Sequence, residues 1–277
     1  MKAAPFAYER PSDLKAAIAL MAEAKHTGKI IAGGQSLGPM LNLRLVQPGL
    51  IIDIAGLTEL KQAERSGDEL VIGACITHGD IEDGRIPDVT RGAMQQVAST
   101  IAYRAVRNRG TIGGSLSHAD PAADWISALS ALGAKVRLRG VNGARDLAIE
   151  EFIIGALESA LQADEIVEAV RVPVLRTSAR WGYVKACRKP GEFAHAIAAV
   201  MIDPEIGAAR VVIGAIEAAP IVLREAAVLF GGHITGNFKQ QFDPGVANAL
   251  LIKAGVASAA DRHIHIAVLR RAIDEAV

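Results

Sequence analysis

The chain has 277 residues, enough for two domains or for one domain with a smaller appendage. Hydrophobic residues make up 51% of the sequence, yet no uninterrupted apolar run reaches the roughly 18 residues that a membrane span needs. The first residues also lack the apolar core of a secretory signal, so we expect a soluble, cytoplasmic protein with no membrane span. Lysine and arginine (30) balance aspartate and glutamate (30), which disfavours nucleic acid as a partner.

Cysteine is scarce in this chain. Cys75 and Cys187 are the only two, far apart and without C-x-x-C spacing. Iron–sulfur clusters and Cys-rich zinc sites need a larger set of thiolate ligands, so neither can be held by this chain alone. Any iron–sulfur cluster that works with this protein must therefore lie on another chain.

The first part of the sequence alternates helical and strand-like patterns. Leu14, Ile18 and Met21 recur at helical spacing behind Pro11, which predicts a helix. Further helices are expected at residues 37–45, 86–105 and 125–132. Short apolar runs predict strands at residues 29–32, 50–54, 70–72, 134–138 and 166–172.

The last third changes from strands to helices. Strands are expected at residues 181–187, 195–202 and 209–215. Helices are expected at residues 221–230, 245–257 and 262–275. Residues 173–178 have the composition of a linker, so we expect two domains, residues 1–173 and residues 179–277. The order of elements predicts an α+β class.

Two Gly-Gly pairs mark places where the backbone can approach a ligand closely. Gly33-Gly34 follows the predicted strand at residues 29–32, and Gly113-Gly114 is expected to form a second loop. Glycine has no Cβ and tolerates positive φ, so consecutive N–H groups in such turns can form an anion-binding concavity. Neutral donors flank both pairs, namely Gln35, Ser36, Thr111 and Ser115. Together the two loops suit a pyrophosphate, although either one alone is typical of an ordinary turn.

The common nucleotide-binding and catalytic patterns are missing from the sequence. No G-x-G-x-x-G opens a βαβ unit and no G-x-x-x-x-G-K-[ST] occurs, which disfavours Rossmann and P-loop proteins. No Ser/His/Asp or Cys/His constellation stands out, and we expect structural roles for His118 and Asp120. The sequence therefore predicts no catalytic residue and no metal ligand.

Both glycine segments resemble the FAD signatures of one protein family. Residues 32–39, Ala-Gly-Gly-Gln-Ser-Leu-Gly-Pro, are similar to the first FAD motif of the medium subunits of molybdenum hydroxylases. Residues 111–124, TIGGSLSHADPAAD, are similar to the second motif, nearly residue for residue, in the carbon monoxide dehydrogenase group. The resemblance covers essentially the whole chain. It implies a PCMH-type FAD-binding domain of two α/β subdomains plus a smaller α+β C-terminal domain.

The resemblance also implies where FAD binds. One side of the pyrophosphate cradle would be Ile30, Ile31, Ala32, Gly33, Gly34, Gln35, Ser36 and Leu37. The other side would be Thr111, Gly113, Gly114 and Ser115. Ile101 and Val167 would be apolar walls of the same site.

Three further side chains have implied roles, each with a plain structural alternative. Asp124 would accept hydrogen bonds from FAD hydroxyls, or would only cap the helix that follows. Lys185 would lie near the flavin, where a cation favours a reduced, anionic ring, or would be a solvent-facing charge on a strand. Phe193 would shield one face of the ring, or would pack in the core.

The function implied by the resemblance is electron transfer in a heterotrimer. A large molybdopterin-binding subunit would hydroxylate the substrate, and a small subunit with 2Fe-2S clusters would pass single electrons onward. FAD on this chain would deliver them to an external electron acceptor. Gln35 and Asn42 depart from the histidine and lysine typical of carbon monoxide-oxidising members, which disfavours that substrate. Two alternatives stay open: a self-sufficient FAD-dependent oxidase, and a scaffold subunit that has lost its cofactor.

An electron relay needs its incoming cluster close to the flavin, so we expect the surface around the flavin to be a subunit interface. The basic residues Arg104, Arg107 and Arg109 precede the second glycine segment, and residues 188–193 follow Lys185. Both segments are candidate docking elements, with ordinary solvated charge as the alternative.

Overall fold

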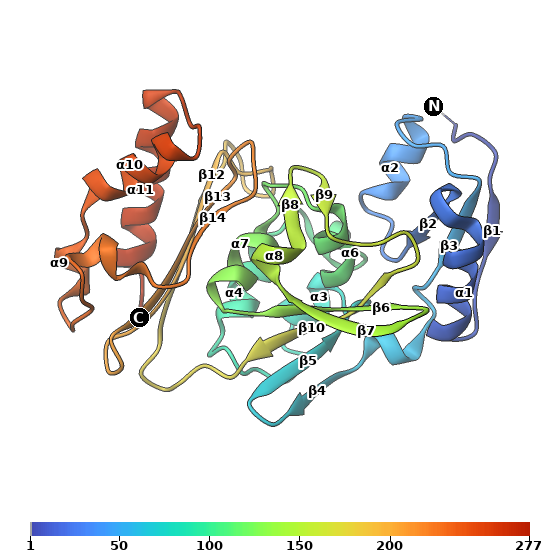
Figure 1. Cartoon of the computed structure of the whole chain (residues 1–277), viewed down its shortest axis with the longest axis horizontal. Coiled ribbons are helices and arrows are strands. Elements are labelled where there is room, and N and C mark those ends of the chain that lie inside the picture. The colour runs from blue at the N-terminus through green and yellow to red at the C-terminus, as the bar shows by residue number, and fades with distance from the viewer. Residues whose placement is uncertain (1) are drawn as a thin grey trace.

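The computed structural model describes residues 2–277 and contains three main β-sheets, of three, five and four strands (Figure 1). The three-stranded sheet is N-terminal, entirely parallel, and ordered β1-β3-β2. Its strands are β1 (Ala7–Glu9), β2 (Gly28–Ile31) and β3 (Leu50–Asp53). Helix α1 (Leu14–Ala24) is preceded by its N-cap Asp13, whose carboxylate accepts from the backbone N–H of Ala16 at 2.8 Å. The predicted first helix and the first two predicted strands are thus confirmed.

The five-stranded sheet is antiparallel, in the order β4-β5-β10-β6-β7. Its strands are β4 (Ala63–Ser66), β5 (Glu69–Gly73), β6 (Lys135–Gly140), β7 (Gly143–Ala148) and β10 (Ile166–Pro173). A layer of short helices covers one face (Figure 1). These are α3 (His78–Glu82), α4 (Ala93–Thr100), α5 (Arg104–Arg107), α6 (Ile112–His118), α7 (Asp124–Ala131) and α8 (Ile149–Phe152). The small remaining elements are α2 (Leu37–Asn42), η1 (Lys25–Thr27), η2 (Thr58–Lys61), β8 (Ile153–Gly155) and β9 (Glu158–Ser159).

The four-stranded C-terminal sheet is an antiparallel meander, ordered β11-β12-β13-β14. Its strands are β11 (Arg180–Ala186), β12 (Ala196–Asp203), β13 (Ala208–Gly214) and β14 (Ile221–Leu223). Helix α11 (Ala259–Asp274) packs on β11 and β12, and α7 packs on the other face of the sheet. Successive residues of a strand point to opposite faces, so Ala198 and Val200 enter one core and Ile197 and Ala199 the other. Burial on both faces explains why β12 is an almost continuous apolar run. The other C-terminal elements are η3 (Ala226–Phe230), α9 (Phe238–Gln241) and α10 (Pro244–Lys253).

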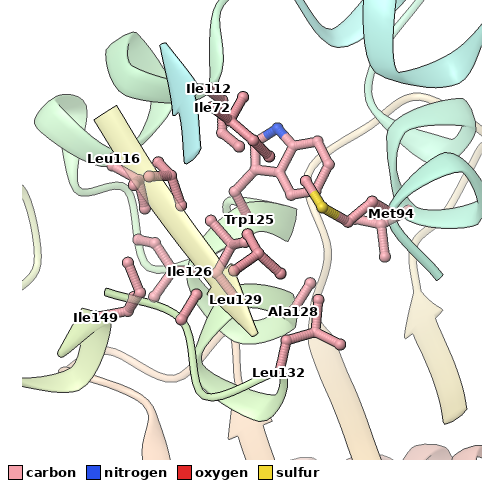
Figure 2. Close-up of a cluster of buried hydrophobic side chains, with 14 of the residues drawn as sticks. Ile72, Met94, Ile112, Leu116, Trp125, Ile126, Ala128, Leu129, Leu132 and Ile149 are labelled. Atoms are coloured by element: carbon pink, nitrogen blue, oxygen red, sulfur yellow. The ribbon is translucent and has the colours of Figure 1, made fainter. Parts of the chain in front are cut away.

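Helix α7 is the centre of the molecule, because every residue from Asp124 to Ala131 is buried. It lies between the helices over the middle sheet and the inner face of the C-terminal sheet. Figure 2 shows Trp125 among Ile72, Met94 and Ile112. On the other side, strand β13 comes so close that a Cβ on Gly214 would overlap the hydroxyl of Ser127. The segment that carries Asp124 is therefore held rigidly by two layers of structure.

Two predicted helices are wrong in extent or type. Residues 86–105 contain only α4 and the start of α5. Positive φ angles at Arg91 (56°) and Gly92 (85°) delay the start of α4, and one at Ala102 (42°) separates it from α5. Residues 221–230 begin as strand β14, whose Val222 pairs with Val212 of β13, and end as the 3-10 helix η3. Edge pairing with a sheet thus overrides a sequence pattern that looks helical. None of the helices within residues 2–277 is long and apolar enough to cross a membrane.

Candidate functional site

A cavity of about 710 Å³ lies between the N-terminal sheet and the helices over the middle sheet. This volume is within the range of roughly 300–1,000 Å³ that small-molecule and cofactor sites occupy. All the predicted cofactor residues except Lys185 line it: Ile30, Ile31, Ala32, Gly33, Gly34, Gln35, Ser36, Leu37, Ile101, Thr111, Gly113, Gly114, Ser115, Asp124, Val167 and Phe193. Segments far apart in the sequence thus meet around one cavity.

The turn between β2 and α2 presents a row of backbone donors to this cavity. Within residues 2–277, no hydrogen bond uses the N–H groups of residues 33–37 as donors. Gly33, Gly34 and Leu37 are half-buried, where N–H groups normally have partners, while Gln35 and Ser36 are exposed. The row is therefore available to an acceptor that comes from outside the chain. Gly34 has a φ of +72°, which lets successive N–H groups turn toward one concavity.

Glycine at position 33 is required by close packing. A Cβ there would overlap the carbonyl oxygen of Arg109 and lie 2.9 Å from Cα of Gly110. The β2–α2 turn therefore touches the segment before α6 backbone to backbone. This contact brings the two sequence motifs together in space.

The second glycine pair is not a loop, which corrects the sequence prediction. Gly113 and Gly114 lie in the first turn of α6, and Thr111 caps that helix by accepting from the N–H of Gly114 at 3.1 Å. The N–H of Ile112 donates to Ile76 and that of Gly113 to Ala74. A Cβ on Gly113 would lie 2.5 Å from the Cβ of Ala74, so glycine here permits close packing against the end of β5. The N–H groups of this segment are used within the protein, unlike those of residues 33–37.

Asp124 is not a helix cap, because Ala123 holds that position and Asp124 is the first helical residue. One of its carboxylate oxygens, Oδ1, accepts from the hydroxyls of Thr100 (3.1 Å) and Tyr183 (2.7 Å) and from Nζ of Lys185 (2.7 Å). No hydrogen bond within residues 2–277 uses Oδ2, and the residue lines the cavity. Burial and the adjacent carboxylate raise the pKa of Tyr183 well above its usual value, so the phenol remains a donor.

Lys185 is neither a wall of the cavity nor a solvent-facing charge. Its side chain is 9% exposed, and Nζ donates to the carbonyl of Thr100 at 2.9 Å as well as to Asp124. The lysine therefore lies behind Asp124 and orients its carboxylate. It links β11 of the C-terminal sheet to the cavity wall.

The apolar residues predicted for the site differ in exposure. Val167 is buried and Ile101 half-buried, as walls of a cavity would be. Phe193 is 69% exposed, so it does not pack in the core. It lies at the mouth of the cavity, which Leu157 also lines, with most of its own surface in solvent.

The basic stretch before α6 is mostly committed to internal ion pairs. Arg107 makes two hydrogen bonds with the carboxylate of Glu82 (2.7 and 2.9 Å) and donates to the carbonyls of Ile101 and Ala102. Arg104 pairs with Glu82 and Asp83, and this holds the pKa of Asp83 at about 2. Arg107 is therefore a structural residue that supports the 101–102 loop, and it is not available as a docking charge. The exposed segment 188–193 stays a candidate.

His78 is one of the polar residues of the cavity wall that sequence reasoning missed. Its Nδ1 accepts from the indole N–H of Trp125 at 3.0 Å, and burial lowers its pKa to about 4. The available signal was the capping box formed by Thr77 and Asp80, which places the start of a helix at His78, with four residues between it and the end of β5.

Residues 4–175 match the model of a known family, the FAD binding domain in molybdopterin dehydrogenase. The caffeine dehydrogenase subunit beta of Pseudomonas sp. (strain CBB1) is 36% identical over 241 residues, which cover 86% of this chain and 82% of the relative. This chain belongs to the family of FAD-binding medium subunits of molybdenum hydroxylases. It is the FAD-binding component of an oxidoreductase.

Two further members of this family extend the similarity to the whole chain. The carbon monoxide dehydrogenase medium chain of Afipia carboxidovorans is 30% identical over 279 residues, covering 98% of this chain and 96% of the relative. A solved carbon monoxide dehydrogenase from Hydrogenophaga pseudoflava, which lacks the Mo-pyranopterin moiety of the molybdenum cofactor, superimposes with a TM-score of 0.85 at 29% identity. That match covers 100% of this chain and 98% of the solved chain. The α+β fold of an FAD-binding medium subunit is thus confirmed.

Proposed function

We propose that this chain transfers electrons within a multi-subunit molybdenum hydroxylase, from iron–sulfur clusters on a partner subunit to an external acceptor, by means of FAD bound in the cavity. The observation that carries the FAD site is the row of unpaired N–H groups at residues 33–37. Backbone donors in a glycine turn bind the oxygens of a pyrophosphate without a metal ion. The cavity, of about 710 Å³, provides space for the rest of the cofactor beside this row.

Different residues of the chain bind different parts of the cofactor. Residues 33–37 bind the pyrophosphate, Oδ2 of Asp124 accepts from a hydroxyl, and Ile101 and Val167 exclude water from the ring. Lys185 and Tyr183 fix the carboxylate of Asp124 by hydrogen bonds to its other oxygen. Bound FAD supplies a redox chemistry that side chains lack, since a flavin can accept electrons singly and release them in pairs.

The partner subunits follow from the relatives and from the cysteine content. The relatives are a subunit beta and a medium chain, and the solved Hydrogenophaga enzyme is a form that lacks the Mo-pyranopterin moiety of its molybdenum cofactor. With only Cys75 and Cys187, this chain cannot ligate the 2Fe-2S clusters of an electron relay. We therefore assign the molybdopterin cofactor to a large partner and the clusters to a small one. Residues 1–173 would hold FAD, and residues 179–277 would form the C-terminal domain.

Purification of the affinity-tagged chain from its native host tests this function. We expect it to bring down a large molybdopterin-containing chain and a small 2Fe-2S chain, and to release FAD rather than FMN on denaturation. In the complex, rapid mixing with an oxidisable substrate should bleach the iron–sulfur and flavin absorbance together. In the isolated chain, the same substrate should leave the flavin oxidised, whereas dithionite should reduce it.

The alternatives give different results in the same experiment. Direct reduction of the flavin by substrate in the isolated chain would show a self-sufficient oxidase. A colourless chain that still assembles with both partners, and does not take up added FAD, would show a scaffold subunit.

A further inference from the structure

His78 is a buried histidine in the wall of the cavity, outside both of the FAD motifs described above. It is the first residue of α3, directly after its N-cap Thr77, and its backbone N–H donates to the carbonyl of Gly110 at 2.9 Å. Its side chain lies against the segment that touches Gly33. The residue is 5% exposed and is one of the residues that line the cavity.

The hydrogen bond from Trp125 determines the tautomer of this ring. An indole N–H can only donate, so Nδ1 of His78, at 3.0 Å, must be the acceptor. The neutral imidazole then carries its proton on Nε2. Trp125 is itself immobile, because it is fully buried in α7 at the centre of the molecule (Figure 2).

The Nε2–H group has no partner within the described part of the chain. No hydrogen bond of residues 2–277 uses this atom, and it is not among their fully buried unpaired atoms, so it keeps enough exposure to meet an acceptor from outside the chain. Gly110 lies beside it, and any Cβ there would come within 2.8 Å of Nε2. Glycine at position 110 therefore keeps the donor clear of a side chain.

The charges around the ring do not force it into the cationic form. Asp124 on α7 favours the imidazolium and Arg107 on α5 opposes it, while desolvation is the largest effect and favours the neutral ring. His78 is thus a neutral donor at physiological pH, like the backbone N–H groups of residues 33–37.

We propose that His78 is a ligand of the cofactor, with its Nε2–H donating to an acceptor atom of bound FAD, and that Trp125 is the positioning residue that sets its tautomer. The proposal rests on the proposed function, because it needs FAD in this cavity. It adds a third contact to the β2–α2 turn and to Asp124. It also gives a partner to the one ring nitrogen of His78 that has none within residues 2–277.

A pair of amide substitutions separates the two nitrogens of the ring. His78→Asn places an oxygen near the position of Nδ1, so it keeps an acceptor for Trp125 but has no donor at the position of Nε2. His78→Gln reaches further and restores an N–H near Nε2. We expect His78→Asn to weaken FAD binding roughly 10-fold or more, and His78→Gln to stay within about 3-fold of wild type.

The measurement is the dissociation constant for FAD of the full-length chain, from quenching of flavin fluorescence, with the melting temperature of the FAD-free chain measured beside it. A second readout is the nitrogen NMR signal of His78, which should report an Nε2–H tautomer and should shift when FAD is added. Trp125→Phe should weaken binding by about 2- to 5-fold, since the ring can then place its proton on either nitrogen.

Equal FAD affinity in wild type and in both His78 variants would overturn the proposal, and would leave His78 as a packing residue. An unchanged NMR signal on FAD addition would do the same. If the wild-type chain itself binds no FAD, the proposed function fails first. If wild type binds FAD and the amide pair shows no difference, only the role of His78 fails.

Discussion

At the scale of single residues, the site depends on polar side chains that are buried and almost fully paired. Asp124 receives three hydrogen bonds on one oxygen, and one of the donors is the ammonium group of Lys185. Both side chains are about 10% exposed or less. An ion pair at this depth is costly to break, because removal of one partner leaves the other charged and desolvated.

Asp124→Asn is therefore expected to destabilise the FAD-free chain by roughly 3 kcal/mol, since Lys185 loses its counter-charge. Lys185→Met in the same background should recover part of this loss, so the two substitutions should be strongly non-additive. Urea unfolding of the two single variants and the double variant measures the coupling. Additive effects would show that Asp124 and Lys185 act independently, against the geometry observed here.

The buried His78 also makes stability depend on pH. Its pKa falls from 6.5 to about 4 on folding, so between these values the unfolded chain binds a proton that the folded chain does not. The free energy of unfolding should therefore fall as pH drops from about 6.5 to about 4, and His78 contributes at most roughly 3 kcal/mol to that fall.

Urea unfolding at pH 7 and pH 4.5 checks this, with His78→Asn as the matched control. The variant should lose roughly 2 kcal/mol less than wild type over this interval, because Asn does not titrate. Identical losses in the two proteins would mean that His78 is not buried in the neutral form.

At the scale of elements, the cavity is made by two turns that touch backbone to backbone. The β2–α2 turn contributes free N–H groups, while the start of α6 uses its own N–H groups internally and contributes close packing. Two glycine pairs that look alike in sequence thus have different structural roles. The difference comes from the cap at Thr111, whose hydroxyl converts the second pair into a helical turn.

Gly33→Ala should damage both the fold and the site, because its Cβ would overlap the carbonyl of Arg109. We expect a cost of roughly 1–3 kcal/mol from overpacking, together with weaker FAD binding as the N–H row moves away. Gly38→Ala is the control, since a Cβ at this position in α2 meets nothing within 4 Å and alanine favours the helix. Calorimetric melting of both variants measures the loss of stability, and FAD titration measures the loss of affinity. Equal stability of the two would contradict the backbone contact.

The helices and strands were mostly predictable where the apolar pattern in the sequence was long. Helix α1 and strands β10 to β13 follow from periodicity and from apolar runs between charged or glycine-rich ends. The structure of residues 86–105 and 221–230 was not predictable, because their local sequence supports a helix that tertiary structure interrupts. In residues 86–105 a positive φ at Ala102 breaks the helix. In residues 221–230 the first residues pair with β13 as the edge strand β14.

At the scale of the whole molecule, the C-terminal sheet is joined to the FAD-binding part by α7 and by a cluster of ions around α8. Glu150 of α8 accepts from Arg210 of β13 at 2.8 Å and from Arg224, just after β14, at 2.7 Å. Its side chain is 12% exposed. The neighbouring Glu151 also pairs with Arg224 but is 52% exposed. One carboxylate thus binds two segments of the C-terminal sheet.

Glu150→Gln should lower the free energy of unfolding by roughly 3 kcal/mol, because the largely buried guanidinium group of Arg210 loses its counter-charge, while the exposed Arg224 keeps Glu151. Glu151→Gln should cost less than about 1 kcal/mol, since exposed ion pairs contribute little. Thermal melts show which of the two variants loses more stability. Limited proteolysis of residues 173–179 shows whether the C-terminal part separates more readily from the rest of the chain. A larger loss of stability in Glu151→Gln than in Glu150→Gln would mean that Glu150 does not hold the C-terminal sheet to α8.

Local sequence was sufficient for the fold class and most strands, because turn chemistry and apolar periodicity act over a few residues. The two segments that we propose hold FAD were indicated by the resemblance to a known family. The residues predicted to bind FAD all line one cavity, with the exception of Lys185. Only the tertiary structure decided that Lys185 lies behind Asp124, that Arg107 is internal, and that His78 faces the cavity. These assignments depend on contacts between residues 25 to 61 positions apart, and the free energy of such contacts comes from burial, which no local pattern records.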